Sequence, residues 1–209
     1  MTITNNFDSI LLNRRSVREY DPNVKIPRDE MLEMIQKATR APSSLNLQPW
    51  RFVVVDSEKG KAALRPLVRW NTIQNDTSAA MVLIFGDLKC YEYGEEIYAK
   101  AVSEGKMTEE EKNQQLADII PDYKSFPKEK MKKVVKLDSC MAAMQFMLVA
   151  RSHGYDSNPI AGFDHGPLAE SVGLDKDRYA PVLMLAVGKA LKPGEETVRL
   201  DAEKITTFK

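Results

Sequence analysis

The sequence predicts a layered domain of the α+β or α/β class, in which short strands are interleaved with helices. Short β-branched apolar runs bounded by turn residues recur along the chain, as at residues 52–55 and 79–85. Segments with apolar residues at helical spacing lie between these runs. One longer run, residues 137–150, is apolar nearly all round, which is typical of a helix covered on every side.

Length and composition narrow the class of protein. The 209 residues suit one domain, 1–209, and 30 basic residues balance 30 acidic ones. Because binding to a phosphate backbone needs a basic surplus, we expect no nucleic-acid partner. Only two cysteines occur, Cys90 and Cys140, far apart in the sequence and without Cys-x-x-Cys spacing, a pattern that is typical of neither a disulfide scaffold nor a zinc site. No apolar run reaches the ~18 residues of a membrane span, and residues 1–6 lack signal-peptide features, so we expect a cytoplasmic protein without membrane contact.

The first elements follow from spacing and turn chemistry. Residues 7–13 predict a short amphipathic helix that ends at a cluster of arginines. Pro27 suits the first position of a second helix, which Pro42 closes. Residues 52–55 predict a buried strand, and residues 58–67 predict a helix that Pro66 limits.

The middle of the chain changes character after a second buried strand at 79–85, which Gly86 and Asp87 are predicted to stop. Charged residues dominate the segment from 87 to 127, and helical patterns occur near 91–103 and 108–119. We interpret this segment as a mobile helical excursion over the body, a lid rather than a second domain.

The C-terminal part begins with a helix predicted over 128–152. Its apolar run of 14 residues is too short to cross a bilayer, so a domain core or a subunit interface must cover it. This helix is followed by a predicted strand at 155–160, a helical turn or two at 167–172 and a buried strand at 181–187. The tail over 190–209 is polar with a few apolar residues, so it is either frayed or strapped onto a neighbouring surface.

Three blocks carry candidate chemistry. The first places three fork-shaped cations around a hydroxyl, which suits a phosphate held in one orientation, although a charged surface turn is the plain alternative. Its residues are Arg14, Arg15, Ser16 and Arg18. The second is a loop of small polar residues before Pro49 and Trp50, or simply a helix stop and a turn. Its candidates are Pro42, Ser43, Ser44 and Asn46.

The third block, residues 158–164, contains Gly162, where a backbone N–H can approach a flat ligand because no Cβ intervenes. A plain strand-to-helix turn is the alternative. Asn71 and Gln74 offer amide groups but also suit a surface loop, and Arg199 alone would be assigned to a solvated tail. The chain lacks the glycine signatures of Rossmann, P-loop and α/β-hydrolase sites.

In their order and spacing, the motifs Arg-Arg-Ser-x-Arg, Ala-Pro-Ser-Ser-x-Asn-x-Gln-Pro-Trp and Pro-x-x-Gly-Phe-Asp resemble those of the FMN-dependent nitroreductase family, over about residues 10–199. The resemblance implies an α+β fold: a three-layer α-β-α sandwich with a central mixed or antiparallel sheet. It also implies an intertwined homodimer with two FMN sites at the subunit interface.

The resemblance assigns roles to single residues. Arg14 and Arg199 would bind the FMN phosphate, with Arg15 or Lys189 as helpers. Ser16 and Arg18 would reach the ribityl chain and the pyrimidine side, and Asn71 and Gln74 the ribityl or the polar edge of the ring. The second block would come from the other subunit. The residues against the ring would be Pro159, Ile160, Ala161 and Gly162, with the Gly162 N–H near N5.

Many members of the family carry an acidic residue where this chain has Ala161, and some carry lysine where it has Gln74. The implied activity is transfer of hydride from NAD(P)H through FMN to a nitroaromatic, a quinone or a related small acceptor, both substrates using one face in turn. No side-chain nucleophile is then required. Tyr123 and Phe126 of the 87–127 lid are candidates for contact with the acceptor. Other chemistry on the same fold, or flavin binding without turnover, remain alternatives.

Overall fold

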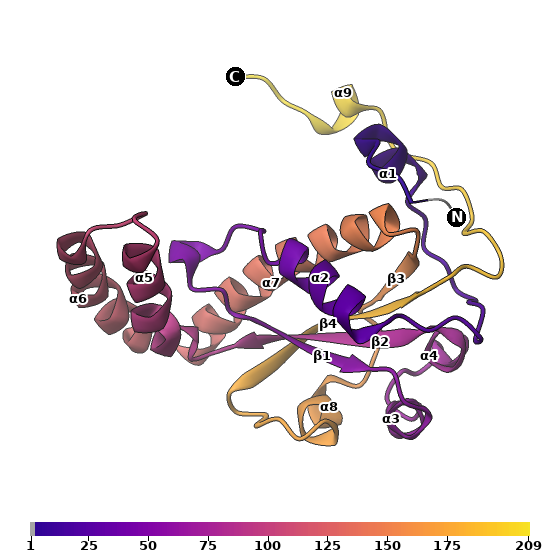
Figure 1. The fold of residues 1–209 in the computed structure, drawn as a ribbon, viewed down its shortest axis with the longest axis horizontal. Coiled ribbons are helices and arrows are strands. Elements are labelled where there is room, and N and C mark those ends of the chain that lie inside the picture. The colour runs from indigo at the N-terminus through magenta and orange to yellow at the C-terminus, as the bar shows by residue number, and fades with distance from the viewer. Residues whose placement is uncertain (1–2) are drawn as a thin grey trace.

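The computed structural model describes residues 3–209; Met1 and Thr2, which belong to the predicted 1–209 domain and to the N-terminal segment 1–6, lie outside them. A four-stranded sheet runs through the centre, with helices on both faces (Figure 1). The strands are β1 (Trp50–Val55), β2 (Ala80–Asp87), β3 (Asp156–Ile160) and β4 (Tyr179–Gly188). Their order is β1-β2-β4-β3, and every pair is antiparallel. This arrangement is of the α+β class.

The central strand β2 is longer than the sequence predicts. Its eight residues are all buried, and Gly86 and Asp87, predicted to stop the strand, are part of it. Gly86 pairs with Trp50 of β1 and Ala180 of β4. A Cβ at position 86 would lie 2.4 Å from a methyl carbon of Val135. The glycine therefore permits close approach of a helix to the sheet, and it does not end the strand.

Strand β1 is correctly placed, but the prediction that it is buried is wrong for its interior. Phe52, Val53 and Val54 are only half-buried. The reason is topological, because β1 lies at the edge of the sheet and, within residues 3–209, pairs with β2 alone. Its β-branched composition could not distinguish an edge strand from a central one.

Each face of the sheet carries its own hydrophobic cluster. On one face, α2 (Arg28–Ala38) and α7 (Lys128–Ser152) pack through Met34 and Phe146 on residues of β2 and β4. On the other face, Leu64, Leu168 and Phe163 pack on Met81 and Met184. The helices there are α3 (Glu58–Leu64), α4 (Thr72–Thr77) and α8 (His165–Ser171). Helix α4 was not predicted, since residues 71–74 suggested only a loop.

The 87–127 segment forms one end of the molecule (Figure 1). It contains a short 3₁₀ turn (Cys90–Tyr93), α5 (Gly94–Ser103) and α6 (Glu109–Ser125). A capping box between Thr108 and Glu111 begins α6. The predicted end near residue 119 is wrong, because α6 continues through Pro121 to Ser125. Ile119 and Tyr123 are buried on either side of the proline, and their packing keeps the last turn helical.

The helix over 128–152 is confirmed as α7, but complete burial of its apolar run is wrong for the single chain. Leu137 is 67% exposed and Met144 38% exposed, and Cys140 is also exposed. Apolar side chains are also exposed near both ends of the part of the chain that the structure describes. Helix α1 (Phe7–Asn13) exposes Phe7 and Leu12, and the tail with α9 (Ala202–Ile205) exposes Phe208 and leaves the body (Figure 1).

Candidate functional site

A cationic cavity of about 360 Å³ lies between the segment after α1 and the C-terminal tail. Five cationic and two acidic side chains line it, an excess of three positive charges. The predicted phosphate residues among them are Arg14, Arg15, Ser16, Arg18 and Arg199. The tail approaches closely at Gly194, where a Cβ would lie 2.5 Å from the Cβ of Arg15. The structure thus joins two segments that are nearly the whole chain apart.

Arg14 carries a buried donor in this cavity. Its Nη1 is buried and has no hydrogen-bond partner within residues 3–209. The pKa of Arg14 lies below its ordinary value, first because the guanidinium is partly buried and then because neighbouring arginines, Arg199 foremost, surround it with positive charge. A buried donor among like charges is costly unless an anion compensates it. The residues present therefore fit a phosphate group.

A second group of predicted residues meets between α4 and the end of β3. Asn71 Nδ2 donates to the carbonyl oxygens of Val68 (3.0 Å) and Gly162 (3.3 Å), and Gln74 Nε2 donates to Asn71 Oδ1 (3.1 Å). Gln74 is buried, whereas Gly162 is exposed. A Cβ at position 162 would meet no described atom within 4 Å, so packing within the chain does not require glycine there.

Strand β3 connects these two groups. Ser16 forms a parallel bridge with Ser157, and the Val17 amide donates to the Ser157 carbonyl at 3.2 Å. The arginine segment consequently runs beside the strand that leads to the ring candidates. These candidates are Pro159 (half-buried), Ile160 (buried), Ala161 (exposed) and Gly162. Block one thus lies beside the strand that carries the start of block three.

The loop of block two lies elsewhere. Pro42 and Asn46 line a separate cavity of about 650 Å³ with residues of α2 and α5, and within the described chain it shares no lining residue with the arginine cavity. Ser44 donates its amide to Asp138 on α7, and its hydroxyl contacts Tyr123 of α6. Ser43 Oγ accepts the Gln48 amide. One chain alone does not bring this loop to the phosphate residues.

Three further candidates are engaged with protein groups. Tyr123 is 5% exposed, bonds Ser44 through its hydroxyl at 2.6 Å and stacks on Phe126. Phe126 is half-buried and lies under the Lys130 ammonium group. The Lys189 ammonium donates to the Gly154 carbonyl and lies over the Tyr155 ring, and it does not line the arginine cavity.

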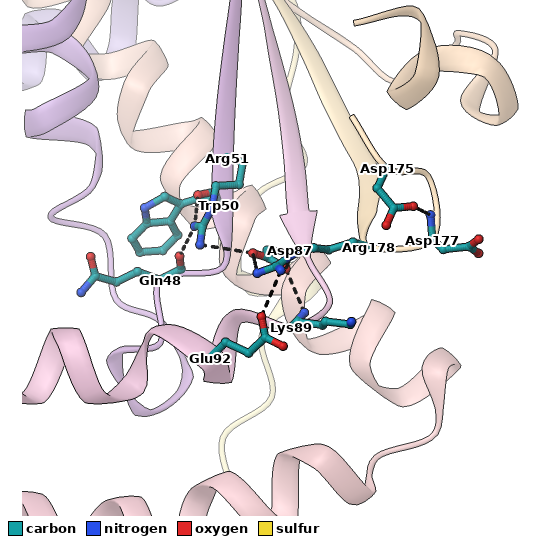
Figure 2. A network of polar contacts seen from close by, with 9 residues as sticks. All are labelled: Gln48, Trp50, Arg51, Asp87, Lys89, Glu92, Asp175, Asp177 and Arg178. Atoms are coloured by element: carbon teal, nitrogen blue, oxygen red, sulfur yellow. Dashed lines mark hydrogen bonds and ion pairs between the residues drawn. The ribbon is translucent and has the colours of Figure 1, made fainter. Parts of the chain in front are cut away.

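Sequence reasoning missed a polar network at the junction of β2 with the 87–127 segment (Figure 2). Asp87 is fully buried and accepts two hydrogen bonds from Arg178, at 2.9 and 3.0 Å, and one from the Lys89 amide. Arg51 lies 3.3 Å from the same carboxylate, and Glu92 pairs with Arg178. The only signal in the sequence is an acidic residue directly after an apolar run, and that pattern by itself predicts the end of a strand.

Two classes of site have no support in the part of the chain that the structure describes. None of its helices is both long and apolar enough to cross a bilayer. No group of three or more histidine, cysteine or acidic side chains within residues 3–209 is arranged to hold a metal ion.

Comparisons with known proteins agree on one family. The model of the nitroreductase family matches residues 11–189. The chain is 46% identical over 209 residues to "putative NAD(P)H nitroreductase YdgI" of Bacillus subtilis, covering all of both chains. It is 39% identical over 207 residues to the CLA biosynthesis enone reductase of Lactiplantibacillus plantarum, covering 99% of this chain and 95% of that protein. A crystal structure of an Exiguobacterium sibiricum nitroreductase homologue in complex with FMN superposes with a TM-score of 0.96 at 45% identity, covering 100% and 99% of the two chains.

Proposed function

The chain belongs to the nitroreductase family, and on that premise we propose that it is an NAD(P)H-dependent FMN oxidoreductase that reduces small organic acceptors. When bound, FMN supplies the redox chemistry, since it accepts a hydride from the nicotinamide and passes the electrons to an acceptor. The chain supplies binding, orientation and electrostatics. Nitroaromatics and quinones are the proposed acceptors, and donor and acceptor use the same face in turn.

The observation that carries this proposal is the buried Arg14 Nη1, which has no hydrogen-bond partner among residues 3–209 and lies in a cavity with three excess positive charges. A phosphate monoester accepts several charge-assisted hydrogen bonds, so it matches a cluster of guanidinium groups. Arg14 and Arg199 therefore hold the FMN phosphate, assisted by Arg15. Lys189 is the weaker candidate because its ammonium group already has protein partners.

The rest of the cofactor lies along the surface that runs beside β3. Ser16 and Arg18 contact the ribityl chain and the pyrimidine side, and Asn71 and Gln74 bind the ribityl or the polar edge of the ring. The ring would pack on residues 159–162, with the backbone N–H of the exposed Gly162 available to hold its N5 side. Positive charge from Arg18 favours the anionic, reduced state of the ring.

A second copy of the chain completes the site. Leu137 and Met144 leave an apolar stripe of α7 exposed, and Val198, Leu200, Ile205 and Phe208 leave the tail without a packing surface. Burying such surface drives association. We propose an intertwined homodimer in which residues 190–209 strap onto the partner and the loop with Pro42, Ser43, Ser44 and Asn46 reaches the partner's FMN. Residues 87–127 then form the wall that selects the acceptor.

A comparison of FMN with riboflavin tests the phosphate site, because riboflavin lacks the phosphate. In Arg14→Ala, the Kd for FMN should rise roughly 10- to 100-fold, the effect of one charge-assisted hydrogen bond to an anion, while the Kd for riboflavin stays unchanged. Arg65→Ala is the matched control, since Arg65 forms an exposed pair with Asp76 outside the site. Equal losses for the two flavins in Arg14→Ala would contradict the assignment.

Turnover is tested by anaerobic addition of NADH and then NADPH to the FMN complex. Loss of the oxidised flavin absorption with either nucleotide supports the reductase and identifies its donor. FMN binding without bleaching would point to the alternatives: other chemistry on this fold or a flavoprotein without turnover. A second acceptor class is activated C=C bonds, because one relative with 39% identity is named an enone reductase. An α,β-unsaturated ketone belongs in the same assay beside a quinone and a nitroaromatic compound.

A further inference from the structure

The loop from Ser43 to Gln48 has an unusual backbone. Leu45, Asn46 and Gln48 have φ angles of 54°, 55° and 47°, in the left-handed region that residues other than glycine seldom adopt. Three such residues within four positions are strained, and strain of this kind persists only when surrounding contacts impose it. The contacts around the loop identify what imposes it here.

Ser44 is held by two buried side chains from different helices. Its amide donates to Asp138 Oδ2 of α7 at 3.0 Å, and its hydroxyl lies 2.6 Å from the hydroxyl of Tyr123 on α6. Asp138 is 4% exposed and Tyr123 5% exposed. Burial raises the pKa of both groups, while the hydrogen bonds with Ser44 lower it. Neither side chain faces bulk water, so Ser44 is their principal polar partner among the described residues.

A third helix holds the next residue. Tyr98 of α5 is buried and donates its hydroxyl hydrogen to the Leu45 carbonyl at 2.7 Å. Leu47 is 1% exposed and packs in the same hydrophobic cluster as Tyr98 and Tyr123. The exposed parts of the loop, Asn46 among them, are thus presented by a fully buried frame.

From this geometry we infer that Tyr98, Tyr123 and Asp138 form a latch that holds the 43–48 loop in its left-handed conformation for contact with the partner's FMN. The three are positioning residues, which act through Ser44 and Leu45. The inference deepens the proposed function and rests on it, because it needs the loop to bind the cofactor. It also changes the role of Tyr123, whose hydroxyl serves the loop and is not available to an acceptor.

The latch has a consequence for the 87–127 segment. Two of its three members lie on α5 and α6, so a displacement of these helices must either break the hydrogen bonds or move the loop with them. Acceptor selection and cofactor binding are therefore linked through Ser44. A substitution in the latch should change the affinity for FMN even though no latch side chain lines the arginine cavity.

The first measurement is amide hydrogen exchange in the protein without added FMN. Within the loop, the amides of Ser44, Asn46, Leu47 and Gln48 are hydrogen-bonded. In Tyr123→Phe and Asp138→Ala their exchange should be roughly two- to tenfold faster, the effect of one lost hydrogen bond. Asp138→Asn keeps an acceptor oxygen for the Ser44 amide, so it should restore the wild-type exchange.

Tyr20→Phe is the matched control. It also removes the hydroxyl of a fully buried tyrosine, which donates to the Ala186 carbonyl at 3.2 Å in a different hydrophobic cluster. This control should leave exchange of the loop unchanged. Unchanged loop exchange in both Tyr123→Phe and Asp138→Ala would overturn the latch, whether or not the protein binds FMN.

The second measurement is FMN titration of the same variants as full-length dimers. The Kd should rise roughly two- to tenfold in Tyr123→Phe and Asp138→Ala and stay at the wild-type value in Asp138→Asn and Tyr20→Phe. Faster exchange with unchanged Kd would overturn the link between the loop and the cofactor. A wild-type protein that fails to bind FMN would refute the proposed function and this link together, while hydrogen exchange would still decide whether the latch exists.

Discussion

Asp87 joins the sheet to the 87–127 segment, and its removal should destabilise the fold strongly. The carboxylate is fully buried and accepts three hydrogen bonds of 2.9 to 3.0 Å, two from Arg178 and one from the Lys89 amide (Figure 2). The guanidinium group of Arg51 lies 3.3 Å from the same carboxylate. These hydrogen bonds raise the pKa of Arg178. In Asp87→Ala both guanidinium groups lose their common partner in a largely buried place.

The magnitude follows from the burial of the partners. Removing one member of a buried ion pair costs about 3–5 kcal/mol. The side chains of Arg178 and Arg51 are 22% and 28% exposed, so water compensates part of the loss. We therefore expect Asp87→Ala to lower the free energy of unfolding by about 2–4 kcal/mol. Since 1 kcal/mol corresponds to roughly 2–4 °C for a chain of this size, the Tm should fall by about 5–15 °C.

Urea unfolding at a fixed FMN concentration measures the effect, because bound ligand shifts the apparent stability. Glu92→Ala is the control, since Glu92 pairs with the same Arg178 at 3.0 Å but is 45% exposed. It should cost less than about 1 kcal/mol. If Asp87→Ala cost no more than Glu92→Ala, burial of the network would not determine its contribution, and the reasoning would be refuted.

Two further predictions concern the proposed dimer and the buried Asp138 of α7. Leu137→Glu places a charge on the exposed apolar stripe, so sedimentation should show a shift toward monomer together with weaker FMN binding. Ala62→Glu, on the exposed side of α3, should leave both unchanged, and a Leu137→Glu protein that stays dimeric would contradict the interface. Burial raises the pKa of Asp138 above 3.8, so its stabilising contribution is complete below that pH and is lost as the pH rises through the raised value. The free energy of unfolding of Asp138→Asn, relative to wild type, should therefore increase as the pH rises above about 4; a difference that does not vary with pH would contradict it.

The local pattern of apolar and turn residues was sufficient to predict most of the helices and strands. The helix over 128–152 and the helix over 7–13 were predicted at their observed bounds, because helical spacing and capping are properties of neighbouring residues. The errors occurred where a distant partner overrides local preference. Gly86 stays in β2 because two strands pair with it and α7 packs against it, and α6 passes Pro121 because buried side chains flank the proline.

The candidate site divides in the same way. The residue types suited to a phosphate, a ring and a polar loop were visible in the sequence, since guanidinium, glycine and small polar residues have their chemistry wherever they lie. Only the tertiary structure brought Arg14 to Arg199, connected Ser16 to Ser157 and assigned Tyr123 to Ser44. The sequence by itself thus determined which chemistry the chain carries and most of its local structure. The fold decided which groups meet and which donors stay unpaired, because burial and distance depend on contacts between segments far apart in the chain.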